Sequence, residues 1–148
     1  MNRFRFRLEV LLDLRKKKEE KIKLVLAEKN NQILSASKLV TELHDALKAL
    51  QENEKTTRRE HLDPVLLRYS ITYRYTLKKK LTDAIRRVDD LKAEAFTIQK
   101  ELVIATQKRK AVEIVKEKRL VEWKRKNHIA EQNFNDDISQ QSFIRNKS

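Results

Sequence analysis

Few side chains in this sequence have the types and spacing that catalysis or metal binding requires. The three histidines, His44, His61 and His128, lie far apart, and no two of them have the spacing of metal ligands. The chain has no cysteine and no glycine, which excludes disulfides, cysteine-ligated zinc and glycine-rich phosphate loops. Its serines and threonines have no organised base beside them. We therefore predict no catalytic residue, no metal site and no cofactor, and a protein that is not an enzyme.

The side chains that could bind a partner are mostly basic. The 148 residues include 35 Lys and Arg against 22 Asp and Glu, which gives a formal net charge of +13. Residues 1–29 hold ten basic and five acidic side chains, and residues 106–126 hold nine and three. Such a distribution favours an acidic protein surface, a nucleic acid or an anionic membrane surface as the partner.

Three tyrosines form a second candidate binding feature. Tyr69 and Tyr73 are four residues apart, so they share a helical face that Leu77 continues. Tyrosine is enriched at protein interfaces. The pattern equally fits a second interpretation, in which Tyr69, Tyr73 and Tyr75 close the loop end of a helical hairpin.

The composition predicts that long helices position these residues. Without glycine the chain cannot make the many tight turns of a sheet-rich fold. Charged residues are 39% of the chain, well above the usual ~25%, which favours a coiled coil over a globular core. Steps of four and three from Leu8 reach ten apolar residues in thirteen, a heptad pattern that we call the first seam. Its members are Leu8, Leu12, Arg15, Glu19, Ile22, Leu26, Lys29, Ile33, Ala36, Val40, Leu43, Leu47 and Leu50.

A second seam follows a polar segment. Asp63 and Pro64, the only proline, have the types expected at a helix N-cap and first helical position. The strict second seam ends at Ala105, because its register then meets Arg109. It consists of nine apolar residues: Leu77, Leu81, Ala84, Val88, Leu91, Ala95, Ile98, Leu102 and Ala105.

Together these patterns predict an all-α, long antiparallel two-helix coiled-coil hairpin that forms a single domain over residues 1–148. We expect helices over about 5–53 and 64–134, a turn over about 54–63 and a frayed tail over 138–148. Residue 4 would lie opposite residue 112, and the paired part would be about 70 Å long. About twenty residues of the second helix would then overhang without a partner. This overhang contains Ile114, Val115, Leu120, Val121 and Trp123.

The apolar side chains of the overhang have two possible explanations. A contiguous exposed apolar patch usually marks an interface, so we favour partner binding. The alternative is that the start of the first helix, or the C-terminal tail, folds over these side chains. No apolar run approaches ~18 residues, and Arg7, Glu9 and Asp13 interrupt the start, so we expect neither a membrane span nor a signal peptide. A cytoplasmic location is therefore expected.

Three segments resemble the FliJ family of the bacterial flagellar type III export apparatus. The opening FRFRLEVLLDLR has the family's alternating phenylalanines followed by leucines and an arginine. The segment ATQKRKAVEIVKEKR resembles its late-helix block, and EQNFNDD resembles its closing acidic element. The residues that carry the resemblance are Phe4, Phe6, Leu8, Leu11, Leu12, Arg15, Arg109, Lys110, Glu113, Glu131, Gln132, Asp136 and Asp137.

The resemblance implies a two-helix coiled coil similar to the gamma-subunit stalk of rotary ATP synthases. Its implied partners are the hexameric export ATPase FliI, the export gate protein FlhA and the export chaperones, with peripheral association at the cytoplasmic face of the membrane. The open end of the hairpin would enter the ATPase ring, and we expect Phe4, Phe6, Leu8, Leu11, Arg15, Arg109, Lys116, Arg119, Trp123, Lys124 and Arg125 to bind it. The resemblance places the gate-binding patch at Tyr73, Leu77, Lys80 and Ala84.

Two other functions fit parts of the sequence. A basic coiled coil could lie along the phosphates of a nucleic acid. However, acidic residues such as Glu9, Glu19 and Glu113 interleave the basic ones, which is typical of solvent-facing coiled-coil positions. A structural homodimer, in which the overhangs of two hairpins pair, is the third possibility.

Overall fold

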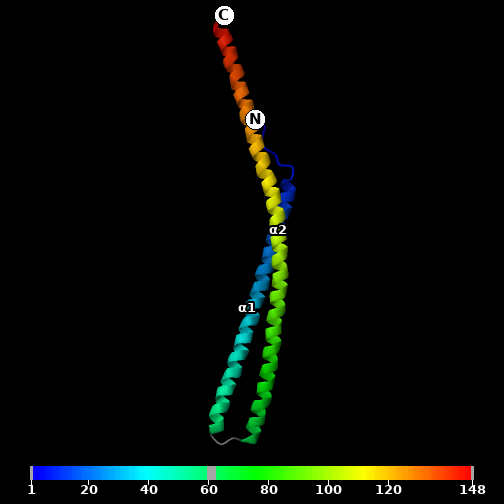
Figure 1. Ribbon diagram of the computed structural model, residues 1–148, viewed down its shortest axis with the longest axis vertical. Coiled ribbons are helices and arrows are strands. Elements are labelled where there is room, and N and C mark those ends of the chain that lie inside the picture. Colours follow the sequence, from blue (N-terminus) through cyan, green and yellow to red (C-terminus); the bar gives the residue numbers. More distant parts are fainter. Residues whose placement is uncertain (1, 60–62, 148) are drawn as a thin grey trace. The chain divides into compact units, whose positions relative to one another are not determined.

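The computed structural model describes residues 2–59 and 63–147, and over these residues it contains two long helices and no strand. Helix α1 spans Glu9–Arg59 and helix α2 spans Pro64–Lys147. Figure 1 shows α1 and α2 as the two arms of a helical hairpin. The predicted all-α coiled-coil hairpin is therefore confirmed.

The helices are longer than the sequence predicted. Helix α1 begins at Glu9 and not near residue 5, and it continues to Arg59 instead of ending near residue 53. Its last turns are polar but contain no helix breaker, and the hydroxyls of Thr56 and Thr57 donate to the carbonyls four residues before them. Helix α2 likewise continues through the segment expected to fray. The centre of the predicted turn, with His61, lies outside the described residues.

The start of α2 has the predicted cap. The carboxylate of Asp63 accepts a 3.0 Å hydrogen bond from the backbone N–H of Val65, and its carbonyl accepts one from Leu67. Pro64 is the first helical residue, where its missing N–H costs no hydrogen bond. No residue in the described ranges has a positive φ, so these ranges use none of the backbone freedom that glycine provides.

The chain divides into two compact units, which we describe separately. The central unit is Lys21–Leu102, and the terminal unit is Met1–Glu20 with Val103–Ser148. In the central unit the second seam supplies the most buried side chains, Leu77, Ala84, Val88 and Leu91. The first-seam residues from Ile22 to Leu50 are half-buried. Every predicted seam position in this unit is thus at least half-buried.

The terminal unit has a different core. Leu12, Ala105 and Val112 are buried, and so is the carboxylate residue Glu19. The second seam does not end at Ala105 as predicted, since Arg109 and Lys116 remain half-buried in the same register. These cations continue the seam because they meet acidic side chains of α1.

The pairing register in the terminal unit also differs from the prediction. Phe4 packs against Trp123, where residue 112 was expected. The prediction was wrong because it ended α1 several residues too early, which shifted every pair along α2. No helix in the described part of the chain carries an apolar stretch long enough to span a membrane.

Candidate functional site

The N-terminal segment of the terminal unit folds over helix α2. Residues 2–6 have no regular secondary structure, and their side chains alternate: Phe4 and Phe6 are half-buried, whereas Arg3 and Arg5 are exposed. Such alternation is the period of an extended chain. The ring of Phe4 lies 5.8 Å from that of Trp123, at an interplanar angle of 58°. The alternating phenylalanines therefore form an aromatic contact with α2.

Phe6 receives two cations of α2 on its ring. The Nζ atom of Lys116 lies 5.9 Å from the ring centroid, and the guanidinium carbon of Arg119 lies 5.8 Å from it. Cations at this distance from an aromatic ring are attracted by its quadrupole. The segment that opens the chain thus joins the basic stretch of α2 through aromatic side chains.

A buried carboxylate organises the next part of this unit. Glu19, whose side chain is 4% exposed, forms an ion pair with Arg109 and accepts a 3.3 Å hydrogen bond from Thr106. Arg109 also pairs with Glu113 at 2.7 Å. The hydrogen bond to Glu19, followed by that to Glu113, raises the pKa of Arg109 above its ordinary value. Arg109 is therefore held inside the interface between α1 and α2.

Two more of the predicted binding residues are engaged within the unit. Arg15 donates a 2.8 Å hydrogen bond to the carbonyl of Lys108, and Lys116 pairs with Glu9 at 2.8 Å. Leu8 and Leu11 are half-buried. These residues build the interface between the N-terminal part of the chain and α2, and the polar groups of Arg15 and Lys116 are already engaged there.

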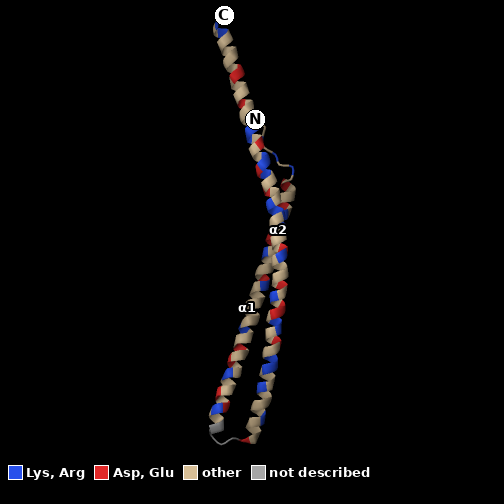
Figure 2. Cartoon of the chain, in the orientation of Figure 1, with Lys and Arg blue, Asp and Glu red and all other residues tan. Residues whose placement is uncertain are grey.

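Three predicted cations remain exposed on α2: Arg119, Lys124 and Arg125. Figure 2 shows basic residues interspersed with acidic ones along both helices. Of the apolar overhang, Trp123 and Leu120 are half-buried, whereas Ile114 is 53% and Val121 is 60% exposed. The second explanation given above therefore holds for Trp123, because the N-terminal segment covers it. Partner binding by the apolar side chains that stay accessible remains a prediction.

The predicted gate-binding residues are divided between the interior and the surface of the central unit. Leu77 is 5% and Ala84 is 8% exposed, so both belong to the helix interface. Tyr73 is 53% exposed, and Lys80 is exposed as well. Only Tyr73 and Lys80 of this set are available to a partner.

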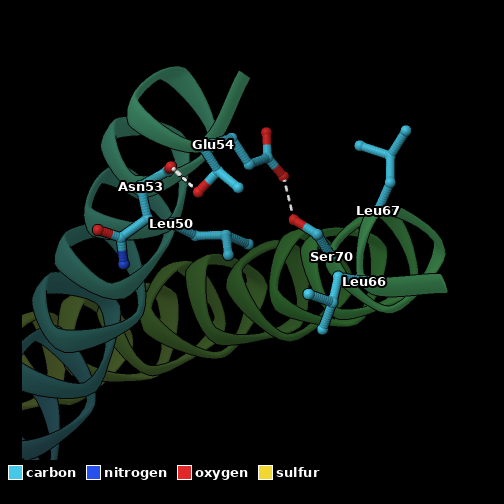
Figure 3. Close-up of a pocket in the computed structure, with 7 residues that line it drawn as sticks. Leu50, Asn53, Glu54, Leu66, Leu67 and Ser70 are labelled. Carbon is cyan, nitrogen blue, oxygen red and sulfur yellow. Dashed lines mark hydrogen bonds between the residues drawn. The ribbon is translucent and has the colours of Figure 1, made fainter. Parts of the chain in front are cut away.

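A pocket of 230 Å³ in the central unit was not found by sequence reasoning. Figure 3 shows Leu50 of α1 facing Leu66 and Ser70 of α2. Glu54 accepts a hydrogen bond from Ser70 and forms an ion pair with Arg74, which holds the arms together here. Tyr69 and Tyr75 are each more than 70% exposed, so they do not close this end of the hairpin. Sequence reasoning missed the pocket because residues 54–63 were expected to form a turn, whereas Glu54 and Thr57 lie on α1 and line it.

Comparison with known proteins identifies the family. No match was found among curated proteins or among solved structures. The family described as Flagellar FliJ protein matches residues 4–148, nearly the whole chain and all of the terminal-unit contacts described above. Its members are components of flagellar export. The two-helix hairpin and the aromatic-basic contacts at its open end thus belong to a chain of the flagellar FliJ protein family.

Proposed function

We propose that this chain is a non-enzymatic coiled-coil stalk of the flagellar type III export apparatus. Its terminal unit binds the hexameric ring of the export ATPase FliI and promotes assembly of that ring. Membership of the FliJ family supports a role in flagellar export. The observation that carries the finer proposal is the exposed trio Arg119, Lys124 and Arg125, which lies beside the aromatic contact of Phe4 and Trp123.

The physical argument is one of charge and accessibility. Within the unit, Arg15 already donates a hydrogen bond, and Arg109 and Lys116 already form ion pairs. Arg119, Lys124 and Arg125 are exposed and can meet acidic groups of a ring, Arg119 from its place at the Phe6 ring. Complementary charge favours fast and specific association more than raw affinity. The trio is therefore suited to guiding the stalk into a ring with an acidic lining.

The central unit supplies the proposed contact with the export gate protein FlhA. Tyr73 and Lys80 are the accessible residues of the expected patch, and they are seven residues apart on one helical face. Leu77 and Ala84 support this face from within the helix interface. Export chaperones would bind the stalk as well, and contact with the gate would hold it peripherally at the cytoplasmic face of the membrane.

The experiment measures ATPase turnover and ring formation with the full chain added. Charge reversal of Arg119, Lys124 and Arg125 to glutamate is expected to abolish stimulation, because the docking charge is inverted. The matched control reverses three exposed cations of the central unit, Lys78→Glu, Lys79→Glu and Arg86→Glu, and should stimulate like the unmodified chain. Normal stimulation by the folded Arg119, Lys124 and Arg125 variant would contradict the docking proposal.

A second measurement tests the gate contact separately. Tyr73→Ala with Lys80→Glu should weaken binding of the chain to the gate protein while leaving ATPase stimulation unchanged. Tyr75→Ala with Lys79→Glu is the control, because both residues are exposed but lie on other faces. Equal loss of gate binding in both variants would show that the contact does not depend on the face of Tyr73.

A further inference from the structure

Helix α2 continues beyond the part that the N-terminal segment covers. Trp123 and Asn127 are half-buried at the end of the covered part, and the same three- and four-residue steps then reach Ala130, Phe134 and Ile138. Phe134 is 65% and Ile138 is 49% exposed. The face that packs against the N-terminal part of the chain is thus continued by the exposed apolar residues Ala130, Phe134 and Ile138. We call the whole face (Trp123, Asn127, Ala130, Phe134 and Ile138) the distal face.

The sequence around the distal face has a mirror order about the point between Ala130 and Glu131. Trp123 precedes this point by as many residues as Ile138 follows it, and Asn127 and Phe134 are related in the same way. A helix paired with a second copy of itself in antiparallel orientation brings such positions opposite each other. Trp123 of each copy would therefore meet Ile138 of the other across a two-fold axis, and Asn127 would meet Phe134.

The charges change sign across the same point. The basic residues Lys124, Arg125 and Lys126 stand before the midpoint, and the acidic residues Asp136 and Asp137 stand after it. Lys126 and Asp137 are eleven residues apart, about three helical turns, so they lie on the same flank of the distal face. A two-fold axis across an antiparallel pair places equivalent flanks together. Lys126 of one copy would then lie two residues, about 3 Å along the helix, from the position opposite Asp137 of the other, which is within reach of the long lysine side chain.

We propose that residues 123–138 of α2 form a self-complementary surface that pairs with the same segment of a second copy of this chain, in antiparallel orientation. The apolar residues of the distal face form the centre, and the symmetric pairs of Lys126 with Asp137 fix orientation and register. This gives the acidic part of EQNFNDD a physical role. The paired segment is short, about 24 Å, so the association is reversible and weak. Although the segment includes Lys124 and Arg125, the variants below leave the docking trio unchanged, so pairing is tested separately from docking to the ATPase.

The test is sedimentation equilibrium of the full chain between about 1 and 100 µM. The unmodified chain should pass from monomer to dimer in this range. K126E and D137K should each weaken dimerisation by about tenfold or more, because two ion pairs become two repulsive contacts. Circular dichroism would verify that both variants remain helical.

Restoration is the decisive part of the experiment. An equimolar mixture of K126E and D137K should dimerise like the unmodified chain, and so should the double variant K126E/D137K. In a parallel pair residue 126 would meet residue 126, so like charges would face each other in the unmodified chain and in each single variant alike. Loss of dimerisation in the single variants, with recovery in the double variant, therefore specifies the antiparallel orientation. Failure of both the mixture and the double variant to recover would overturn the proposal.

Two phenylalanines provide a matched control for the distal face. Phe134→Ala should remove dimerisation, whereas Phe143→Ala should leave it unchanged, because Phe143 is similarly exposed but lies nine residues away, on the opposite side of the helix. A chain that stays monomeric at about 100 µM would overturn the proposal. Protection of residues 127–138 from hydrogen exchange only when the ATPase is present would overturn it as well, and would assign the face to that partner.

Discussion

The central and terminal units pack the same two helices with different kinds of side chain. In the central unit the buried residues are apolar and mostly small or branched, as Ala84, Val88 and Leu91 show. In the terminal unit a buried carboxylate, Glu19, lies in the seam and meets Arg109. An apolar seam permits a shift by one heptad at modest cost, but a buried charge that loses its partner is strongly unfavourable. The terminal unit is therefore where the pairing register is specified.

The two units also differ in what they leave exposed. The terminal unit engages several cations internally and keeps Arg119, Lys124 and Arg125 at the surface. The central unit instead exposes tyrosines, with Tyr69 at 72% and Tyr73 at 53%. The two surfaces differ in their exposed side chains, which suits the two different partners that we propose, the ATPase and the export gate.

The largest expected effect concerns the apolar helix interface of the central unit. Leu91→Asp places an unpaired charge at a position that is 2% exposed, so the free energy of unfolding should fall by more than about 3 kcal/mol. Thermal unfolding followed by circular dichroism measures this loss. Ile85→Asp, at a position that is 45% exposed on the same helix, should change little. An unchanged melting temperature for Leu91→Asp would show that the seam is assigned incorrectly.

The next effect concerns the buried ion pair of Glu19 with Arg109 in the terminal unit. Glu19→Leu or Arg109→Leu alone should lower the melting temperature, because each leaves an ionised partner in the interface. The double variant Glu19→Leu/Arg109→Leu should recover most of the loss, since an apolar pair can replace a buried ion pair. Losses that simply add in the double variant would mean that Glu19 and Arg109 act independently.

A smaller effect tests the N-terminal contact of the terminal unit. Phe4→Ala removes the aromatic partner of Trp123 and should reduce the free energy of unfolding by about 1 kcal/mol. Because Trp123 is the only tryptophan, its fluorescence should shift to the red as the ring becomes wetter. Phe96→Ala, at a 60% exposed position of the central unit, should leave the emission unchanged. Unaltered emission in Phe4→Ala would exclude the contact.

The smallest effect concerns an exposed ion pair of the central unit. Lys29 donates a 2.6 Å hydrogen bond to Glu94, and this bond lowers the pKa of the Glu94 carboxyl below its ordinary value. A carboxyl with a depressed pKa stabilises the fold above its ordinary pKa, and the contribution is lost as the pH falls through the depressed value. The melting temperature of the Glu94→Gln variant should therefore fall slightly less than that of the unmodified chain as the pH is lowered. An NMR titration in which Glu94 keeps an ordinary pKa would contradict the pairing.

The heptad pattern was sufficient to predict the hairpin, because spacing alone identifies which positions face a partner helix. It could not predict where α1 ends, since polar residues such as Thr56 extend a helix as readily as apolar ones once no proline or glycine intervenes. Composition likewise predicted a basic open end. It could not show that Arg109 is engaged by Glu19 while Lys124 is exposed, because that difference depends on the pairing register.

Hydrogen–deuterium exchange of the full chain, with and without the flagellar export ATPase, tests the central claim most directly. It reports the protection of backbone amides along both units in one measurement, and under the proposal only the terminal unit binds the ring. The account predicts that added ATPase protects residues 106–126 of α2 and the N-terminal segment that contacts them, while residues 66–100 exchange as before. Protection confined to the central unit, with residues 106–126 unchanged, would contradict it.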